Sequence, residues 1–476
     1  MHLISRVIGA LFLLLLIIVA GGVVWLSVSP PELLRVGDGY AAKIVCSNTF
    51  IAKRDPEKVL ADDVQAPGNP ALKLVSVSVD REDGVVTARF LGMFAPNYAL
   101  YRGALGCTTV PDGDLHAARS AVFLNKVRVA KNDSLWPDGS KVVLDQNETG
   151  VALSKLIANP DFAGPEMRAI VVVKDGRIAA EAYGDGFNNG TPLIGWSMTK
   201  TVNAAIIGRL MLSGRMSFDD QNLLPQWSGD VRKNIKLSDL LGMESGLAFN
   251  EGYGAVSDVT RMLYLDPDST RVAASAPQEA PAGERFNYSS GTAILLARLW
   301  MNRLPNESAA IAYPREALFA PLGMSSAVFE ADERGTYVGG SYLYATARDW
   351  ARFGQFLLQD GVWKGQRLLP EGFVGAMRTP TTASEGIYTQ VQAWLAGPGG
   401  SDAQFGLPTD TFWMLGHDGQ SVAIVPSANL VLVRMGLTPG WVDYKPQILL
   451  KKILDITTPA KTSGPTGANK MVQDNQ

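Results

Sequence analysis

A serine and a lysine three residues apart, Ser197 and Lys200, form the pair of side chains with the clearest chemical potential in this sequence. Three residues are close to one helical turn, so both side chains can face the same side of a helix. A serine hydroxyl is a poor nucleophile at neutral pH and needs a base within hydrogen-bonding reach. The spacing therefore fits a nucleophile with its own base, although a helix-capping serine followed by a solvated lysine fits it as well.

The residues after this pair favour the chemical interpretation. Apolar residues recur at helical spacing, which predicts a buried helix that begins at the serine: Val202, Ala205, Ile206, Leu210 and Met211. A cation in the first turn is disfavoured by the helix macrodipole. We therefore expect the field of the helix to lower the pKa of Lys200 towards the neutral range, where an amine works as a base.

Two further clusters accompany the pair, at residues 281–291, which contain Tyr288 and Ser290, and at residues 416–421. Together with Ser197-Met198-Thr199-Lys200 they resemble the three motifs of serine β-lactamases and penicillin-binding proteins in order and rough spacing. The likeness is closer to class C-type esterases and 6-aminohexanoate-dimer hydrolases, and it covers about residues 165–455. Supporting stretches lie at residues 240–247, 340–346 and 348–354.

The resemblance implies roles for individual residues. Tyr288 would be a second proton carrier, and a neighbouring Lys200 ammonium would lower the pKa of its phenol. The backbone N–H groups of Ser197 and Gln420 would form an oxyanion hole. Gly419 would let the backbone approach the substrate closely. A core tyrosine with a satisfied hydroxyl is the alternative for Tyr288.

Two departures from the family pattern bear on the substrate. Ser290 stands where an asparagine is usual, and His417-Asp418-Gly419 stands where Lys-Thr-Gly is usual. We expect His417 to be mostly neutral at pH 7 and to meet a substrate carboxylate less well than lysine. The sequence thus favours a serine hydrolase acting on a small ester or amide. A β-lactamase or D-alanyl-D-alanine carboxypeptidase, and a non-catalytic, membrane-tethered binding or regulatory protein of the same fold, are the alternatives.

Composition and the remaining motifs argue against other classes of protein. The three histidines, His2, His116 and His417, are widely separated, so we expect no metal. No glycine-rich loop follows a strand and opens a helix, and we expect no cofactor. The formal net charge of −3 comes without a basic run or stripe, which argues against a nucleic-acid partner. The sequence carries no indication of oligomeric state.

Residues 7–26 are apolar and free of charge, and Arg6 precedes them. This length can span a bilayer, and Arg6 would keep the N-terminus in the cytoplasm. We expect an uncleaved membrane anchor with the catalytic region outside the cytoplasm; a cleaved signal peptide, which would give a secreted protein, is the competing interpretation. In such an oxidising compartment Cys46 and Cys107 would form a disulfide. The loop-entropy model gives this bond a stabilisation of the folded state of about 3–4 kcal/mol. Two buried free thiols are the alternative.

The pattern of strands predicts an α+β fold. Three hairpins are expected, at residues 74–79 with 85–90, 169–173 with 178–183, and 422–425 with 430–435. The last two would form one antiparallel sheet from both ends of the hydrolase region, with flanking helices and an inserted helical domain. We divide the chain into an anchor or signal segment (1–34), a small region with its connector (35–150), a hydrolase domain (151–457) and a disordered tail (458–476).

Overall fold

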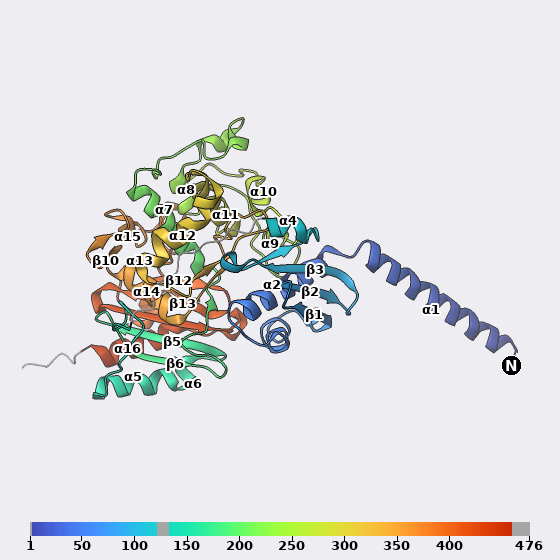
Figure 1. Ribbon diagram of the computed structural model, residues 1–476, viewed down its shortest axis with the longest axis horizontal. Coiled ribbons are helices and arrows are strands. Elements are labelled where there is room, and N and C mark those ends of the chain that lie inside the picture. The colour runs from blue at the N-terminus through green and yellow to red at the C-terminus, as the bar shows by residue number, and fades with distance from the viewer. Residues whose placement is uncertain (1, 121–132, 459–476) are drawn as a thin grey trace, which may run out of the picture.

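A five-stranded antiparallel sheet lies at the centre of the hydrolase region in the computed structural model, which describes residues 2–120 and 133–458 (Figure 1). Its strands follow the order β12-β13-β14-β5-β6. Leu432 of β14 pairs with Val172 of β5, which joins the two ends of the region and confirms the expected fold class. The strands are β5 (Met167–Lys174), β6 (Arg177–Tyr183), β12 (Phe412–Gly416), β13 (Gln420–Val425) and β14 (Leu430–Gly436).

Helices cover both faces of this sheet, because successive strand residues point to opposite sides. Val171 and Val173 belong to the larger core, which includes residues of α7 (Met198–Leu212) and α14 (Ala347–Leu358). Ile170 and Val172 pack instead on the other side, in a second core shared with three helices. These are α5 (Glu148–Ala158), α6 (Pro160–Ala163) and α16 (Pro446–Thr457). Of the three, α5 and α6 lie lowest in Figure 1.

The middle of the chain supplies the inserted helical part, as predicted. A small sheet of β7 (Leu193–Ile194), β8 (Val328–Phe329) and β9 (Leu343–Ala345) marks where the chain leaves and re-enters the sheet region. The helices between are α8 (Leu237–Leu241), α9 (Asp258–Tyr264), α10 (Ser269–Ala274), α11 (Ser290–Asn302), α12 (Glu307–Pro314) and α13 (Ala320–Leu322). Short elements β10 (Val362–Trp363), β11 (Gln366–Arg367) and α15 (Phe373–Ala376) follow. Helix α11 packs on α7, so the second motif lies beside the first.

The small N-terminal region is a four-stranded sheet covered by a helix that the sequence did not predict. The expected hairpin forms between β1 (Val75–Asp80) and β2 (Val85–Phe90), and β3 (Phe94–Tyr101) and β4 (Cys107–Val110) extend it. Helix α2 (Glu32–Phe50) packs on this sheet and is buried from Ala41 to Phe50. The boundary expected at residue 34 thus lies in its first turn. Two short helices, α3 (Pro56–Val59) and α4 (Leu115–Ser120), complete the region.

Buried polar contacts fasten this region to the hydrolase part. Lys43 of α2 pairs with Glu330 at 2.5 Å, and both side chains are almost fully buried. Cys107, which forms a disulfide with Cys46, donates its backbone N–H to the same Glu330 at 2.6 Å. Arg102 donates to the backbone carbonyls of Ala331 and Asp332. The two parts therefore share a buried interface.

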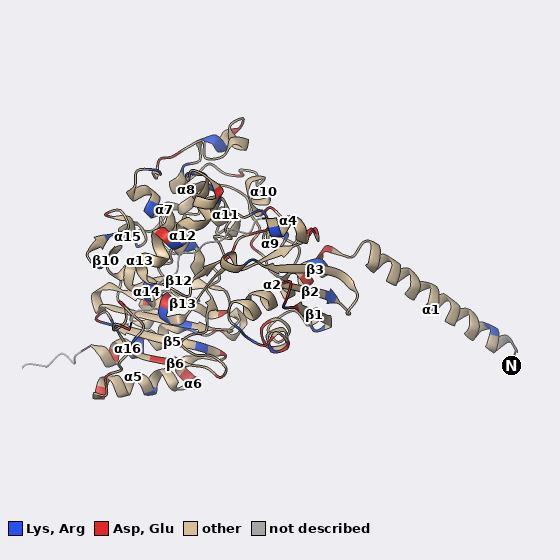
Figure 2. Ribbon diagram, in the orientation of Figure 1, with Lys and Arg blue, Asp and Glu red and all other residues tan. Residues whose placement is uncertain are grey.

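The N-terminal helix α1 (His2–Val28) extends away from the rest of the chain (Figure 1). Figure 2 shows no charged residue along it after Arg6. Residues Ile4–Val28 are long and apolar enough to cross a membrane, and none of them is buried in the protein. A signal sequence has the same properties, so this helix is compatible with anchoring and with secretion.

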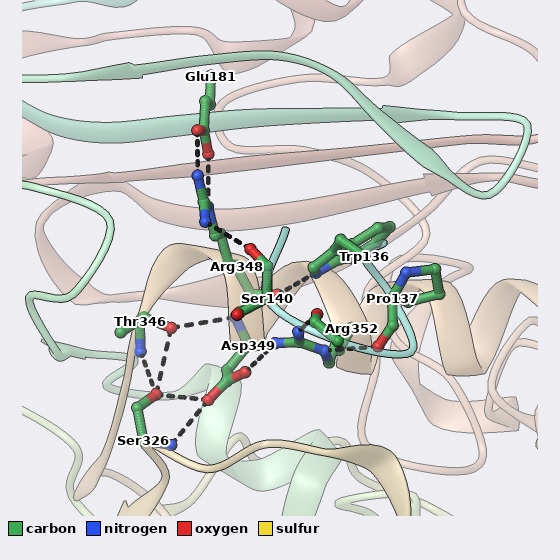
Figure 3. Close-up of polar contacts among 10 residues, drawn as sticks. Trp136, Pro137, Ser140, Glu181, Ser326, Thr346, Arg348, Asp349 and Arg352 are labelled. Carbon is green, nitrogen blue, oxygen red and sulfur yellow. Dashed lines mark hydrogen bonds and ion pairs between the residues drawn. The ribbon is translucent and has the colours of Figure 1, made fainter. Parts of the chain in front are cut away.

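The connector before α5 lies on the hydrolase part, against the first turns of α14 (Figure 3). Trp136 is buried, and its indole N–H donates to the carbonyl of Arg348 at 3.3 Å. Arg352 donates to Pro137 O at 3.0 Å, and Arg348 binds both Ser140 O and the carboxylate of Glu181. Residues 134–141 are thus held by the hydrolase part. The tail expected to be disordered lies outside the described residues beyond Thr458.

Candidate active site

Ser197 lies at a sharp turn between β7 and α7. Trp196 before it has a φ of 47°, a left-handed conformation that is rare for a bulky residue. A Cβ on Gly195 would lie 2.2 Å from the Trp350 ring, so only glycine fits there. Ser197 is the N-cap of α7, yet its side chain makes no capping hydrogen bond. The hydroxyl is partly exposed and accepts a hydrogen bond from Lys200 instead, which argues against the capping interpretation.

Lys200 is 1% exposed, and its Nζ makes three hydrogen bonds. The acceptors are Ser197 Oγ at 3.0 Å, Ser290 Oγ at 3.1 Å and Gly340 O at 3.0 Å. Burial lowers the pKa of Lys200 to about 8, although the negative charge of Glu251 acts against this shift. The expected direction is therefore right, but the principal cause is burial rather than the helix macrodipole.

Tyr288 completes this group, with a pKa opposite to the expectation. Lys200 Nζ lies 4.7 Å from the centroid of its ring, in a cation–π arrangement. Burial raises the pKa of the Tyr288 phenol above its ordinary value; a hydrogen bond with Ser197 lowers it, and the charge of Glu251 raises it further. The expected lowering by Lys200 is thus wrong, because desolvation outweighs attraction. A protonated phenol near Ser197 can donate a proton or a hydrogen bond, and is a poor base.

The third cluster is a tight turn between β12 and β13. Asp418 and Gly419 have φ values of 56° and 79°. A Cβ on Gly416 would lie 2.2 Å from Gly195 O, so the end of β12 packs directly on the chain between β7 and Ser197. The Gln420 side chain is buried and donates to the carbonyls of His417 at 3.1 Å and Asp418 at 3.0 Å. That side chain therefore holds the turn, so the oxyanion role expected of Gln420 would depend on its backbone N–H.

Gly419 and His417 both lie in this turn, in different environments. A Cβ on Gly419 would lie 2.9 Å from an Arg434 nitrogen, so the glycine is needed for packing inside the turn. The His417 ring lies between Trp196 and Tyr253, with centroids 5.8 and 5.5 Å away, and its side chain is 53% exposed. Burial lowers the pKa of His417, but the hydrogen bond to Asp418 and the charges of Asp418 and Glu251 outweigh it, so the pKa is raised. His417 thus carries more positive charge than expected.

Glu251 is a residue of this site that the sequence did not reveal. Ser290 donates its backbone N–H to Glu251 Oε2 at 2.8 Å and its hydroxyl to Glu251 Oε1 at 2.5 Å. Tyr253 also donates to Glu251 Oε1, at 3.3 Å. Glu251 lies in a loop, 39 residues before Ser290, where no periodicity assigns a side chain to a face. The turn-forming residues around it were the only available signal.

The geometry brings together a serine, a buried lysine and a phenol from the starts of two helices, beside the turn that joins β12 and β13. A model of the Beta-lactamase family matches residues 164–447. A 6-aminohexanoate-dimer hydrolase of Paenarthrobacter ureafaciens is 24% identical over 297 residues, which are 57% of this chain and 72% of that protein.

The fold is shared with solved structures of other proteins. A Bacillus anthracis protein, provisionally assigned as a 6-aminohexanoate-dimer hydrolase, has a TM-score of 0.54 and 22% identity, over 72% of this chain and 94% of its own. A penicillin-binding protein homologue from Caulobacter crescentus has a TM-score of 0.54 and 14% identity, over 67% of this chain and 99% of its own. At these identities the likeness establishes the architecture alone.

Proposed function

This chain belongs to the Beta-lactamase family, and we propose that it is a serine hydrolase that cleaves an ester or amide bond through an acyl-enzyme on Ser197. The observation that carries the proposal is the hydrogen bond of 3.0 Å between Lys200 Nζ and Ser197 Oγ. Since burial lowers the pKa of Lys200 to about 8, about a tenth of the molecules hold a neutral amine at pH 7. A base of this kind is active near neutrality.

The reaction follows from these proton positions. Lys200 Nζ takes the proton of Ser197 Oγ as the oxygen bonds to the substrate carbonyl carbon, and backbone N–H groups of Ser197 and Gln420 stabilise the oxyanion. The C–O or C–N bond then breaks, and the leaving group receives the Tyr288 proton, which the Lys200 ammonium replaces. Water then attacks the acyl-enzyme. Its proton passes to Tyr288 while the Tyr288 proton passes to neutral Lys200. The bond to Ser197 Oγ breaks, Lys200 returns a proton to that oxygen, and the acid is released.

The apolar helix α1 and the disulfide both support a location of the catalytic part outside the cytoplasm. A disulfide between Cys46 and Cys107 persists in oxidising compartments and is rare in the cytosol. With α1 as an uncleaved anchor and Arg6 on the cytoplasmic side, the catalytic part would face the periplasm or the exterior.

The acyl-enzyme is tested with a fluorophosphonate probe on the full chain in detergent. We expect a covalent label on Ser197, located by peptide mass spectrometry, and its complete loss in Ser197→Ala. Ser213→Ala, a change in a serine at the end of α7, should leave the labelling intact. A folded protein without label on Ser197 would contradict the proposal.

A β-lactamase or carboxypeptidase activity is the second candidate, because the raised pKa of His417 supplies part of the positive charge that a lysine would carry. Ester turnover should still exceed β-lactam turnover, since His417 is half exposed and its charge is shared with Asp418. We expect a short-chain nitrophenyl ester to be hydrolysed faster than nitrocefin at equal concentration. Faster nitrocefin hydrolysis, abolished by Ser197→Ala, would favour the second candidate instead.

A further inference from the structure

We infer that Glu251 is a positioning residue for the reaction proposed at Ser197. Glu251 accepts the hydroxyl hydrogen of Ser290, so Ser290 cannot donate that hydrogen to Lys200. The lone pair of neutral Lys200 is then directed to Ser197. The inference rests on the proposed function. It concerns the direction of the lone pair of Lys200. The family pattern does not explain that direction here, because Ser290 replaces the usual asparagine.

The contact between Glu251 and Ser290 is two-pronged. Ser290 is the first residue of α11, and Glu251 receives both its backbone N–H and its hydroxyl hydrogen, at 2.8 and 2.5 Å. The carboxylate thereby also lies at the positive end of the α11 dipole. Ser290 itself is 1% exposed, so water cannot readily replace this partner.

The loop around Glu251 is held against α11 by other contacts as well. The Phe249 ring lies where a Cβ on Gly291 would be, 2.5 Å from the nearest ring atom. Asn287 donates its amide to the carbonyls of Leu247 at 3.0 Å and Phe249 at 3.4 Å. These contacts fix the backbone on the N-terminal side of Glu251, so its carboxylate is placed by packing rather than by the Ser290 bond alone.

The direction of the hydrogen bonds decides how Lys200 can act. A serine hydroxyl has one hydrogen, and because Glu251 takes it, Ser290 Oγ offers only lone pairs to Lys200 Nζ at 3.1 Å. Gly340 O, at 3.0 Å, is an acceptor as well. A neutral lysine has two N–H hydrogens and one lone pair. Both hydrogens are used by these acceptors, so the lone pair faces Ser197 Oγ.

Without the carboxylate, the hydroxyl of Ser290 is free to turn and donate its hydrogen to the lone pair of Lys200. It would then compete with Ser197 for the base. An asparagine at position 290 would bring its own carbonyl acceptor and would need no such partner. With Glu251 bound to its hydrogen, Ser290 Oγ can only accept a hydrogen bond from Lys200, as the asparagine carbonyl would.

Glu251 also acts on the site through its charge. It raises the pKa of Lys200 against the effect of burial. The other titratable groups facing it are Tyr253 and Tyr288, and His417 with its partner Asp418. Neutralising Glu251 should therefore lower the pKa of Lys200 and move the rise of activity with pH to lower pH.

The test measures how fast a fluorophosphonate labels Ser197 as a function of pH, in the full chain. For Glu251→Gln we expect labelling at pH values above the midpoint of the pH profile to slow by about tenfold or more. Losses of this size are usual when a residue that orients a reacting group is removed. The midpoint of the pH profile should fall by about 0.5–1 unit. Adding Ser290→Asn should restore most of the rate. Glu279→Gln, an exposed carboxylate paired with Arg285, is the matched control and should change neither value.

Glu251→Asp separates position from charge: it should slow labelling while keeping the wild-type midpoint, and it serves as the second variant if Glu251→Gln does not fold. A wild-type rate and midpoint in folded Glu251→Gln would overturn the inference. A loss of rate that Ser290→Asn does not rescue would overturn it too, since the role would then be purely structural. Absence of label on wild-type Ser197 would instead refute the proposed function.

Discussion

Replacing Lys200 by methionine is expected to slow acylation of Ser197 by about 10²–10⁴-fold, because no other base contacts the nucleophile among the described residues. Methionine has a similar length, and Lys200 is bound by neutral oxygens rather than by a carboxylate, so its loss leaves no unpaired charge and the fold should tolerate the change. In the wild type the rate should rise with pH through about 8, since the pKa of Lys200 is about 8 and the neutral amine is the reactive form.

The measurements are the hydrolysis of a nitrophenyl ester and fluorophosphonate labelling of the same samples, with circular dichroism to establish folding. Lys155→Met, which removes an exposed lysine from α5, is the matched control and should leave the rates unchanged. A loss smaller than tenfold, or a rate that falls between about pH 7 and 8, would show that another group is the base.

Replacing Lys43 by methionine is expected to lower the free energy of unfolding by about 3–5 kcal/mol, because it leaves Glu330 buried without its counter-ion. Burial raises the pKa of Glu330, and the attraction of Lys43 opposes this rise. Adding Glu330→Gln should recover part of the loss, since an amide carries no charge and its carbonyl can still accept from Ser47 and Cys107.

Urea unfolding followed by tryptophan fluorescence measures this effect. The control is Lys236→Met, which breaks an exposed ion pair with Asp219 and should change the free energy of unfolding far less. If Lys43→Met cost no more than this control, the buried pair would not be what fastens the small N-terminal region to the hydrolase part.

The strands of the hydrolase sheet were predictable from sequence because their patterns are local. Residues 169–173 and 430–435 are short apolar runs next to turn residues, and they form β5 and β14. Helix α2 was not predictable in the same way. It contains Gly37 and Gly39, which lower helix propensity, and its buried residues contact two different parts of the protein.

The sequence identified which residues could form the site, but it did not reveal how deeply they are buried or which groups contact them. Ser197 and Lys200 lie on one helix, so their spacing along the chain fixes their proximity. Glu251 reaches Ser290 only through a loop, which has no period from which to place it. The pKa of Tyr288 depends on how deeply it is buried, and that depth is a property of the whole fold.

The pairing of β14 with β5 also determines when this protein can fold during synthesis. Leu432 must find Val172, about 260 residues earlier in the chain, before the central sheet closes. Contacts of such long range form slowly, and one edge of β5 stays unpaired until β14 has emerged. If α1 delivers the chain across a membrane, it does so first, while the strand that completes the sheet arrives last. We therefore expect nascent chains that end before β14 to be inactive, prone to aggregation and dependent on chaperones on the far side of the membrane.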